Sequence, residues 1–272
     1  MSGAEALAIA VWRLAIAWGV IGVLLVARGG WREWHGLSRR DLLLALAAGA
    51  LLAVHFWSWI ASLSHTTVAA SVLLVNLHPV VIVAGSLLWL KERPTRAQLV
   101  GIAVALVGAG VIALDGRGDP DAGGAAGAAF GNSLAILGAV TVGLYYLVGR
   151  SLRQRLSLLP YVGLVYGACL LVLLAFSAVQ GTHLAPQPSR EWGIFAAIAI
   201  GPMLVGHTGF NWSLRYVPAV VVSLLLLLEP VGASLLAFFL PAIRETPGVW
   251  TLVGGAVLLL GLGWTAYRDA SA

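Results

Sequence analysis

Six side chains that could bind a solute lie inside long apolar stretches of this chain. They are His55, Trp59, His78, His207, Asn211 and Glu229. An ionisable side chain inside a bilayer costs roughly 2.5–3.5 kcal/mol, so it is kept where it is paired, meets water or has a function. We therefore expect these residues to line a small-molecule site, in which aromatic faces hold apolar groups and the histidines, amide and carboxylate hold polar ones.

Glu229 and His78 occupy corresponding places, each directly before a proline in the middle of an apolar stretch. Such a proline removes a backbone hydrogen bond and kinks the helix, so nearby carbonyl groups could face a cavity. Glu229 could bind a cationic group or a proton, and His78 could face it from the other copy of the pattern. The alternatives are a carboxyl group satisfied by a neighbouring helix and a histidine packed in the core.

The other four residues form two pairs with helical spacing. His55 and Trp59 are four positions apart, as are His207 and Asn211, so each pair lies on one face of a helix. Either these faces line a pocket, or they make interhelical hydrogen bonds that hold a bundle together.

Three further polar side chains are expected at the membrane surface. Arg13 comes early in its apolar stretch, and its long side chain could reach the lipid headgroups; the alternative is that it anchors a substrate or a helix. Tyr145 and Tyr146 lie near the end of another stretch, where interfacial anchoring is the ordinary role of tyrosine.

The composition indicates a membrane protein. Hydrophobic residues make up 60% of the chain and charged residues only 10%, whereas a soluble domain carries about 25% charged residues. Apolar stretches of roughly the 20 residues that span a bilayer occur at 6–27, 41–63, 67–90, 97–114, 131–149, 159–179, 192–212, 217–240 and 248–266. The short connections leave no room for a soluble domain. We predict an all-α polytopic membrane protein, a bundle of about nine transmembrane helices.

Several functional classes are not indicated. The sequence has no Walker loop, no His-Glu-x-x-His motif and no Gly-x-Ser-x-Gly motif, so we expect no cofactor, no bound metal and no catalytic residues. Cys169 is the only cysteine, which excludes an intrachain disulfide. The expected partners are the lipid bilayer and a small-molecule substrate rather than nucleic acid, because the basic residues sit in the connections between apolar stretches. The oligomeric state is not predicted.

The basic residues orient the chain. Twelve fall on alternate connections and the C-terminal tail: Arg28, Arg32, Arg39, Arg40, Lys91, Arg93, Arg96, Arg150, Arg153, Arg155, Arg215 and Arg268. The opposite face has only Arg117, Arg190 and Arg244. By the positive-inside rule, the C-terminus is predicted to be cytoplasmic, in a multi-pass protein of the cell inner (plasma) membrane.

One motif occurs twice. The first copy runs from His78-Pro79 through Lys91-Glu92, and the second from Glu229-Pro230 through Arg244-Glu245. Glu92 in the first copy and Glu245 in the second copy are each followed by glycines nine, sixteen and eighteen positions later. We expect these glycines to let helices pack closely. The two copies are predicted on opposite membrane faces, which makes the duplication an inverted repeat of the kind found in secondary transporters.

The duplication divides the chain into two halves. Residues 1–114 form a first repeat of four helices, 115–130 an extracytoplasmic linker, and 131–272 a second repeat of five helices. The unequal count predicts that one helix is missing at the N-terminus, through a misassigned start or a truncation.

The pattern resembles the EamA-type drug/metabolite transporter superfamily, and the chain is similar to an EamA-like family permease. The likeness rests on three features of each copy: a proline-interrupted apolar stretch, then the tripeptide Lys-Glu-Arg in the first copy or Arg-Glu-Thr in the second, and then a helix with the pattern Gly-x6-Gly-x-Gly. The Trp12-Arg13 pair and the stretches His55–Pro79 and His207–Pro230 strengthen it. The resemblance implies ten helices in two inverted halves and export of small metabolites such as amino acids or related compounds.

The sequence therefore favours a secondary transporter that works by alternating access. Two alternatives remain: a membrane-embedded lipid-modifying enzyme, and a truncated remnant that does not transport. The enzyme would need catalytic groups clustered near one leaflet, whereas the polar residues here recur at corresponding places in the two halves.

Overall fold

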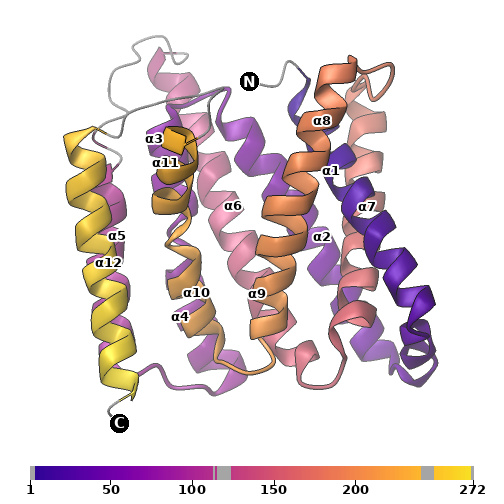
Figure 1. Ribbon diagram of the computed structural model, residues 1–272, viewed down its shortest axis with the longest axis horizontal. Coiled ribbons are helices and arrows are strands. Elements are labelled where there is room, and N and C mark those ends of the chain that lie inside the picture. Colours follow the sequence, from indigo (N-terminus) through magenta and orange to yellow (C-terminus); the bar gives the residue numbers. More distant parts are fainter. Residues whose placement is uncertain (1–3, 113, 115–123, 240–247, 271–272) are drawn as a thin grey trace. The chain divides into compact units, whose positions relative to one another are not determined.

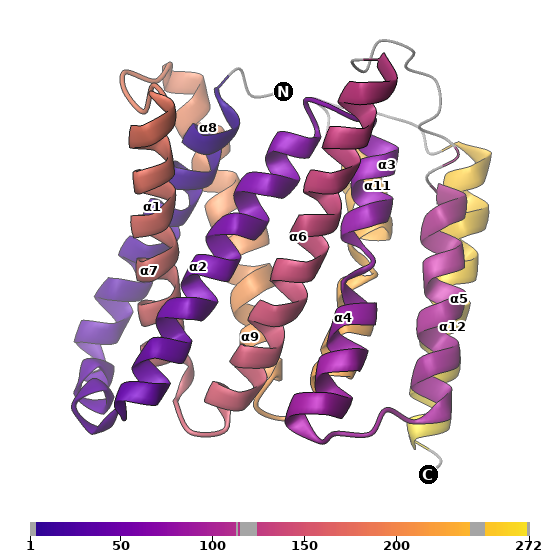
Figure 2. The same ribbon diagram turned by 180° about the vertical axis from the view of Figure 1, so that it is seen from behind.

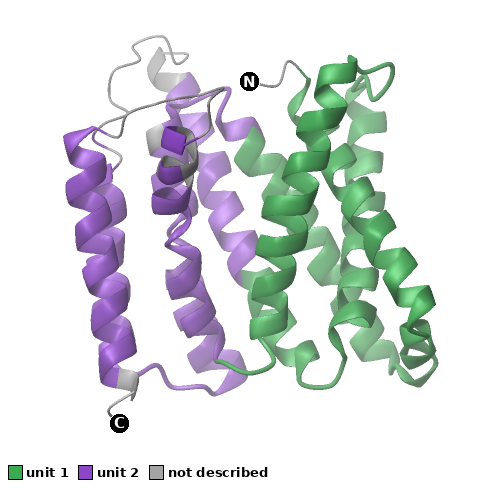
Figure 3. Ribbon diagram, in the orientation of Figure 1, with its two compact units in different colours: residues 1–60, 144–217 green, residues 61–143, 218–272 purple. Residues whose placement is uncertain are grey.

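The computed structural model describes residues 4–112, 114, 124–239 and 248–270, and every regular element in these ranges is a helix (Figures 1 and 2). The Arg244-Glu245 part of the second motif and most of the predicted linker lie outside the described residues. The chain divides into two compact units (Figure 3). Unit 1 comprises Met1–Ile60 and Leu144–Val217, and unit 2 comprises Ala61–Gly143 and Pro218–Ala272.

Each predicted apolar stretch contains helix. Seven helices in the described ranges are long and apolar enough to cross a membrane, and Arg96–Ile112 and Ala219–Gly232 are shorter apolar helices. The all-helical, multi-pass prediction is confirmed, while the number of spans and the inverted repeat stay predictions. The compact units combine segments from both sequence halves, so they do not bear on the predicted duplication.

Unit 1 contains seven helices in addition to the C-terminal part of α6. They are α1 (Ala6–Ala27), η1 (Gly30–Gly36), most of α2 (Arg39–Ser62), α7 (Leu158–Gln180), α8 (Ser189–Ile198), η3 (Ala199–His207) and α9 (Thr208–Ser213). Helix α1 packs against α7, α8 and η3. The short helix η1 was not predicted. It follows Gly29, whose φ of 65° ends α1 in a left-handed turn, and Trp34 holds it by donating from Nε1 to the Pro160 carbonyl at 3.1 Å.

Unit 2 contains the remaining helices. They are α3 (Val68–Val75), α4 (His78–Gly85), η2 (Ser86–Leu90), α5 (Arg96–Ile112), the first part of α6 (Gly124–Arg153), α10 (Ala219–Leu226), α11 (Glu229–Phe239) and α12 (Val249–Ala270). Two of the predicted stretches are interrupted just before their prolines, between α3 and α4 and between α10 and α11. Because proline cannot donate a backbone hydrogen bond, each new helix starts at the residue before it. The predicted interruptions are confirmed, and α4 packs against α10.

The repeated glycines form the crossing of α5 and α12. A Cβ atom on Gly108 would lie 2.6 Å from the Gly254 carbonyl oxygen, and one on Gly101 would lie 2.9 Å from the Gly261 oxygen. These four glycines therefore pack backbone against backbone, as the spacing predicted. Gly263 has open space around it, so the third glycine of the second motif has no such role.

Candidate functional site

Four of the six predicted site residues lie in unit 1. His55 and Trp59, on α2, stack with ring centroids 6.0 Å apart and an interplanar angle of 8°. His207 ends η3, and Asn211, one turn later on α9, donates from Nδ2 to the His207 carbonyl at 2.8 Å. The predicted one-face arrangement of each pair is confirmed.

Phe56 links these pairs. The Arg13 guanidinium lies over the Phe56 ring, 3.8 Å from its centroid, and His207 approaches the same ring edge-on at 5.2 Å. The His55 ring is 5.3 Å from it. Arg13 is only 7% exposed. The prediction that it reaches the headgroups was wrong, because its side chain turns into the unit and packs on an aromatic face.

The two adjacent tyrosines belong to the same cluster. Tyr145 and Tyr146 are fully buried, so the prediction that they anchor at the membrane surface was wrong. The Tyr146 hydroxyl lies 3.3 Å from His207 Nδ1, and Asn211 donates from Nδ2 to the Tyr145 hydroxyl at 2.5 Å. A buried phenol needs a hydrogen-bond partner, and the neighbouring helices provide one.

The cluster continues onto α7. The Tyr166 hydroxyl lies 3.0 Å from Thr208 Oγ1 and 3.5 Å from Asn211 Nδ2, and both Tyr166 and Asn211 are fully buried. Neither Tyr166 nor Thr208 was among the residues predicted from the sequence. A tyrosine within an apolar stretch, which must find a polar partner if it is buried, was the signal that could have identified it.

Asn211 keeps one unused acceptor. Its Nδ2 must face the His207 carbonyl, because a carbonyl can only accept, and this fixes the orientation of the amide. Its Oδ1 is then buried and accepts no hydrogen bond from the described residues. We call the set Arg13, His55, Phe56, Trp59, Tyr145, Tyr146, Tyr166, His207, Thr208 and Asn211 the polar–aromatic cluster.

The helix that carries His207 is irregular. Residues Ala199–His207 form a π-helix with Pro202 inside it. Proline removes a backbone hydrogen bond, and π-helical turns are frequent at functional sites. The wider turn therefore sets the position from which His207 meets Phe56 and Tyr146.

The other two predicted site residues lie in unit 2, where each starts a helix after an interruption. His78 begins α4, is 5% exposed, and lies with Nδ1 3.2 Å from the Val75 carbonyl and close to the backbone of Ser223 on α10. Glu229 begins α11 and its side chain is exposed. The two corresponding residues thus differ in burial.

The arrangement suits binding of a small molecule. It offers aromatic faces, hydroxyl groups, imidazoles and a guanidinium within spans of low polarity. The described residues contain no group of three or more His, Cys, Asp or Glu side chains that could hold a metal ion.

Comparison with proteins of known sequence gives related transporters. The chain is 23% identical over 257 residues to the Uncharacterized transporter YyaM of Bacillus subtilis (strain 168), an alignment that covers 93% of this chain and 82% of that protein. It is 28% identical over 200 residues to a Probable terminal-alkyne amino-acid exporter of Streptantibioticus cattleyicolor, covering 73% of this chain and 64% of the exporter. The matched part is thus less than two thirds of the exporter's length.

A solved crystal structure has the same fold. It superposes with a TM-score of 0.77 over 98% of this chain and 90% of the other, at 18% identity. The sequence profile of the EamA-like transporter family matches residues 1–114 and 129–267. Since these two matched ranges of the family profile cover nearly all of a multi-pass helical chain, the protein belongs to the EamA-like transporter family.

Proposed function

We propose that this transporter exports a small organic metabolite, an amino acid or a related compound, across the inner (plasma) membrane by alternating access. Its C-terminus lies in the cytoplasm, on the side with most basic residues. The observation that carries the proposal is the polar–aromatic cluster. Apolar helices bury imidazole, hydroxyl, amide and guanidinium groups together, and ionisable groups at such positions are kept where they are paired, meet water or have a function.

The cluster has groups for both parts of an amino-acid-like solute. The stacked His55 and Trp59 rings would contact an apolar side chain. Asn211 Oδ1 would accept a hydrogen bond from an N–H group, since no described residue uses it. The exporter relative is named for an amino-acid substrate, which supports this class of solute.

The glycine contacts support an inverted repeat. In the duplicated motif Gly101 corresponds to Gly254, and Gly108 to Gly261. The observed contacts join Gly101 to Gly261 and Gly108 to Gly254, so α5 and α12 are antiparallel. If each glycine is replaced by its counterpart in the other motif, the first contact becomes the second and the second becomes the first. A two-fold axis perpendicular to both helices has this property. Such an axis lies in the membrane plane when the helices span the bilayer, as alternating access in inverted-repeat transporters requires.

The interruptions before Pro79 and Pro230 support the same mechanism. Discontinuous helices at corresponding places in two halves are typical of substrate and ion sites in secondary transporters. We propose that His78 and Glu229, at these interruptions, take part in the transport cycle, with Glu229 binding a proton or a cationic group. The named relatives are transporters, which favours transport over the lipid-modifying enzyme considered above.

Solute flux into proteoliposomes tests the site. A panel of radiolabelled amino acids first identifies a transported solute in the wild-type protein. Tyr146→Phe then removes only the hydroxyl group next to His207, and flux should fall about two- to tenfold, the effect of one hydrogen bond. Tyr216→Phe is the matched control, because the Tyr216 side chain is exposed in the same unit. Equal flux in both variants would place the solute elsewhere.

A further inference from the structure

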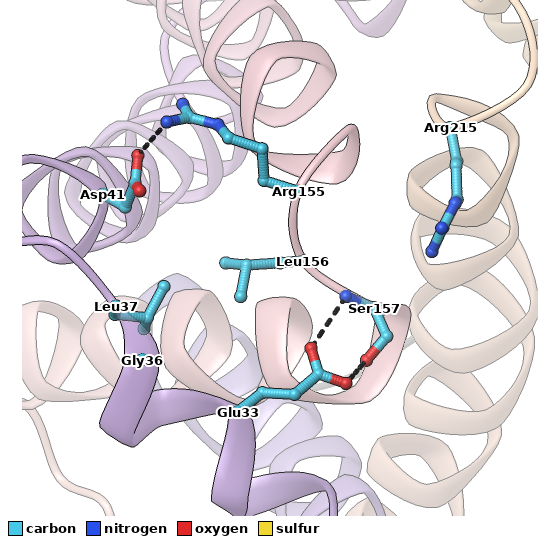
Figure 4. Close-up of a pocket in the computed structure, with 8 residues that line it drawn as sticks. All are labelled: Glu33, Gly36, Leu37, Asp41, Arg155, Leu156, Ser157 and Arg215. Carbon is cyan, nitrogen blue, oxygen red and sulfur yellow. Dashed lines mark hydrogen bonds and ion pairs between the residues drawn. The ribbon is translucent and has the colours of Figure 1, made fainter.

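A polar hollow lies at one end of unit 1, apart from the polar–aromatic cluster (Figure 4). Four segments form it: η1, the start of α2, the connection from α6 to α7, and the connection after α9. Its volume is about 520 Å³, and it is lined by Glu33, Gly36, Leu37, Asp41, Arg155, Leu156, Ser157 and Arg215. In the proposed topology this end faces the cytoplasm.

Both acidic side chains in the hollow have defined places. Asp41 pairs with Arg155 at 2.6 Å, with side-chain exposures of 13% and 50%. Glu33 accepts hydrogen bonds from the backbone N–H of Ser157, at 3.1 Å, and from its hydroxyl group. Ser157 precedes the first turn of α7, where a negative charge is favoured by the helix dipole. Each oxygen of Glu33 has a further lone pair directed away from these bonds.

The backbone at Arg215 is also fixed. Arg150 donates from Nη1 to the Leu214 carbonyl at 2.7 Å, and Gln154 donates from Nε2 to the carbonyls of Leu214 and Arg215 at 3.2 Å. These bonds satisfy carbonyl groups at the end of α9. The Arg215 side chain is exposed and makes no hydrogen bond or ion pair with the part of the chain that the structure describes. The hollow thus presents one guanidinium whose donors are all available.

We propose that this hollow binds a small zwitterion, with its oxyanion on Arg215 and its ammonium group on Glu33. A guanidinium donates in a fork that matches a carboxylate or a phosphate. The two acidic and two basic lining residues sum to zero charge, so a ligand of zero net charge with separated charges complements the hollow better than a simple anion or cation. Leu37 and Leu156 contact the apolar part of the ligand.

Two kinds of molecule have this combination of an oxyanion and an ammonium group. One is a free amino acid in the cytoplasm, and the other is the ethanolamine phosphate headgroup of a membrane lipid. The hollow lies beside Trp31 and Trp34 of η1, which line a neighbouring depression, and aromatic residues of this kind are common at headgroup level. Binding at this hollow does not depend on the transport site proposed above.

Calorimetric titration of the full chain in dodecyl maltoside tests the proposal. The probes are L-leucine, glycerophosphoethanolamine, and glycerol 3-phosphate, which has an oxyanion but no ammonium group. Arg215→Gln should weaken zwitterion binding by about tenfold or more, as expected for a lost charge-assisted hydrogen bond. Glu33→Gln should weaken binding of the zwitterions but not of glycerol 3-phosphate. Arg40→Gln is the matched control, because Arg40 is an exposed basic residue of the same region that does not line the hollow.

The probes also separate the two sources. Tighter binding of L-leucine identifies a solute site, and tighter binding of glycerophosphoethanolamine identifies a lipid site; either supports the proposal. It is overturned if neither zwitterion binds the wild-type protein, or if Arg215→Gln and Arg40→Gln have equal effects. It is also overturned if Glu33→Gln weakens all three probes alike. Because the Arg215 side chain makes no hydrogen bond or ion pair with the described residues, its substitution should leave the unfolding temperature unchanged, which is measured in parallel.

Discussion

The α5–α12 crossing gives a quantitative prediction, because the three atoms nearest to a Cβ added at Gly108 are all backbone atoms. A Cβ atom added to Gly108 would lie 2.6 Å from both the Gly254 oxygen and the Leu258 nitrogen, and 2.9 Å from the Leu258 Cα. Ordinary van der Waals contact begins at 3.4 Å. No flexible side chain can move aside, so the Gly108→Ala substitution must push the helices apart by roughly 0.8 Å, and overpacking of this kind costs about 1–3 kcal/mol.

Gly263→Ala provides the control for that experiment. Gly263 lies on α12 with nothing within 4 Å of its added Cβ, and it receives the same gain in helix propensity, up to about 1 kcal/mol. The difference between the two variants therefore isolates the overpacking. SDS-induced unfolding, followed by circular dichroism, should show Gly108→Ala to be less stable than Gly263→Ala by about 1–3 kcal/mol. Equal stability of the two variants would refute the backbone contact between α5 and α12.

Three further outcomes are expected. Glu229→Gln should change the pH dependence of solute flux between about pH 5 and 8, since it removes the carboxylate proposed to bind a proton or a cationic group; an unchanged rate and profile would make the carboxyl group structural. Asp41→Asn should lower stability by no more than about 1 kcal/mol, because its partner Arg155 is half exposed and screened by water; a larger loss in SDS unfolding would contradict this. A cysteine introduced at Ser271, in a Cys169→Ala background, should resist a membrane-impermeant maleimide added to whole cells; labelling without lysis would reverse the topology.

The helices and interruptions could be predicted because they depend on local properties of the chain. Length and hydropathy indicate spanning helices, and a proline in an apolar stretch ends one hydrogen-bonded segment and starts another. The glycine contacts could be predicted from their spacing for Gly101 and Gly108, since a repeated small residue is useful where helices cross. The short helix η1 could not, because its residues, Gly30–Gly36, have neither an apolar run nor a helical period.

The site was predicted in part. His55, Trp59, His207 and Asn211 were found because polar residues within spans are rare and their four-residue spacing implies one face. Whether such a helix face points toward lipid or into the bundle is a separate property. In a membrane both lipid and protein are apolar, so hydropathy does not separate a lipid-facing side chain from one inside the bundle.

The same limit explains the two wrong predictions. An arginine or a tyrosine near a helix end has the same sequence pattern whether it meets headgroups or neighbouring helices. Only the packing of α1 against α2 shows that Arg13 lies over Phe56, and only the packing of α6 against η3 shows that the Tyr146 hydroxyl meets His207. Sequence reasoning would need the identity of the neighbouring helix to make that choice.

In the proposed repeat, the backbone contacts of the two copies correspond more closely than their side chains do. The glycine contacts exchange with one another under the repeat, yet His78 is buried where the corresponding Glu229 is exposed. The buried hydroxyl groups of Tyr145, Tyr146 and Tyr166 all come from the second half of the sequence. In the proposed cycle, an inverted repeat with identical side chains would make the inward-open and outward-open states equal in energy. Unequal side chains give the two states different affinities for solute, and this difference sets which state the solute favours.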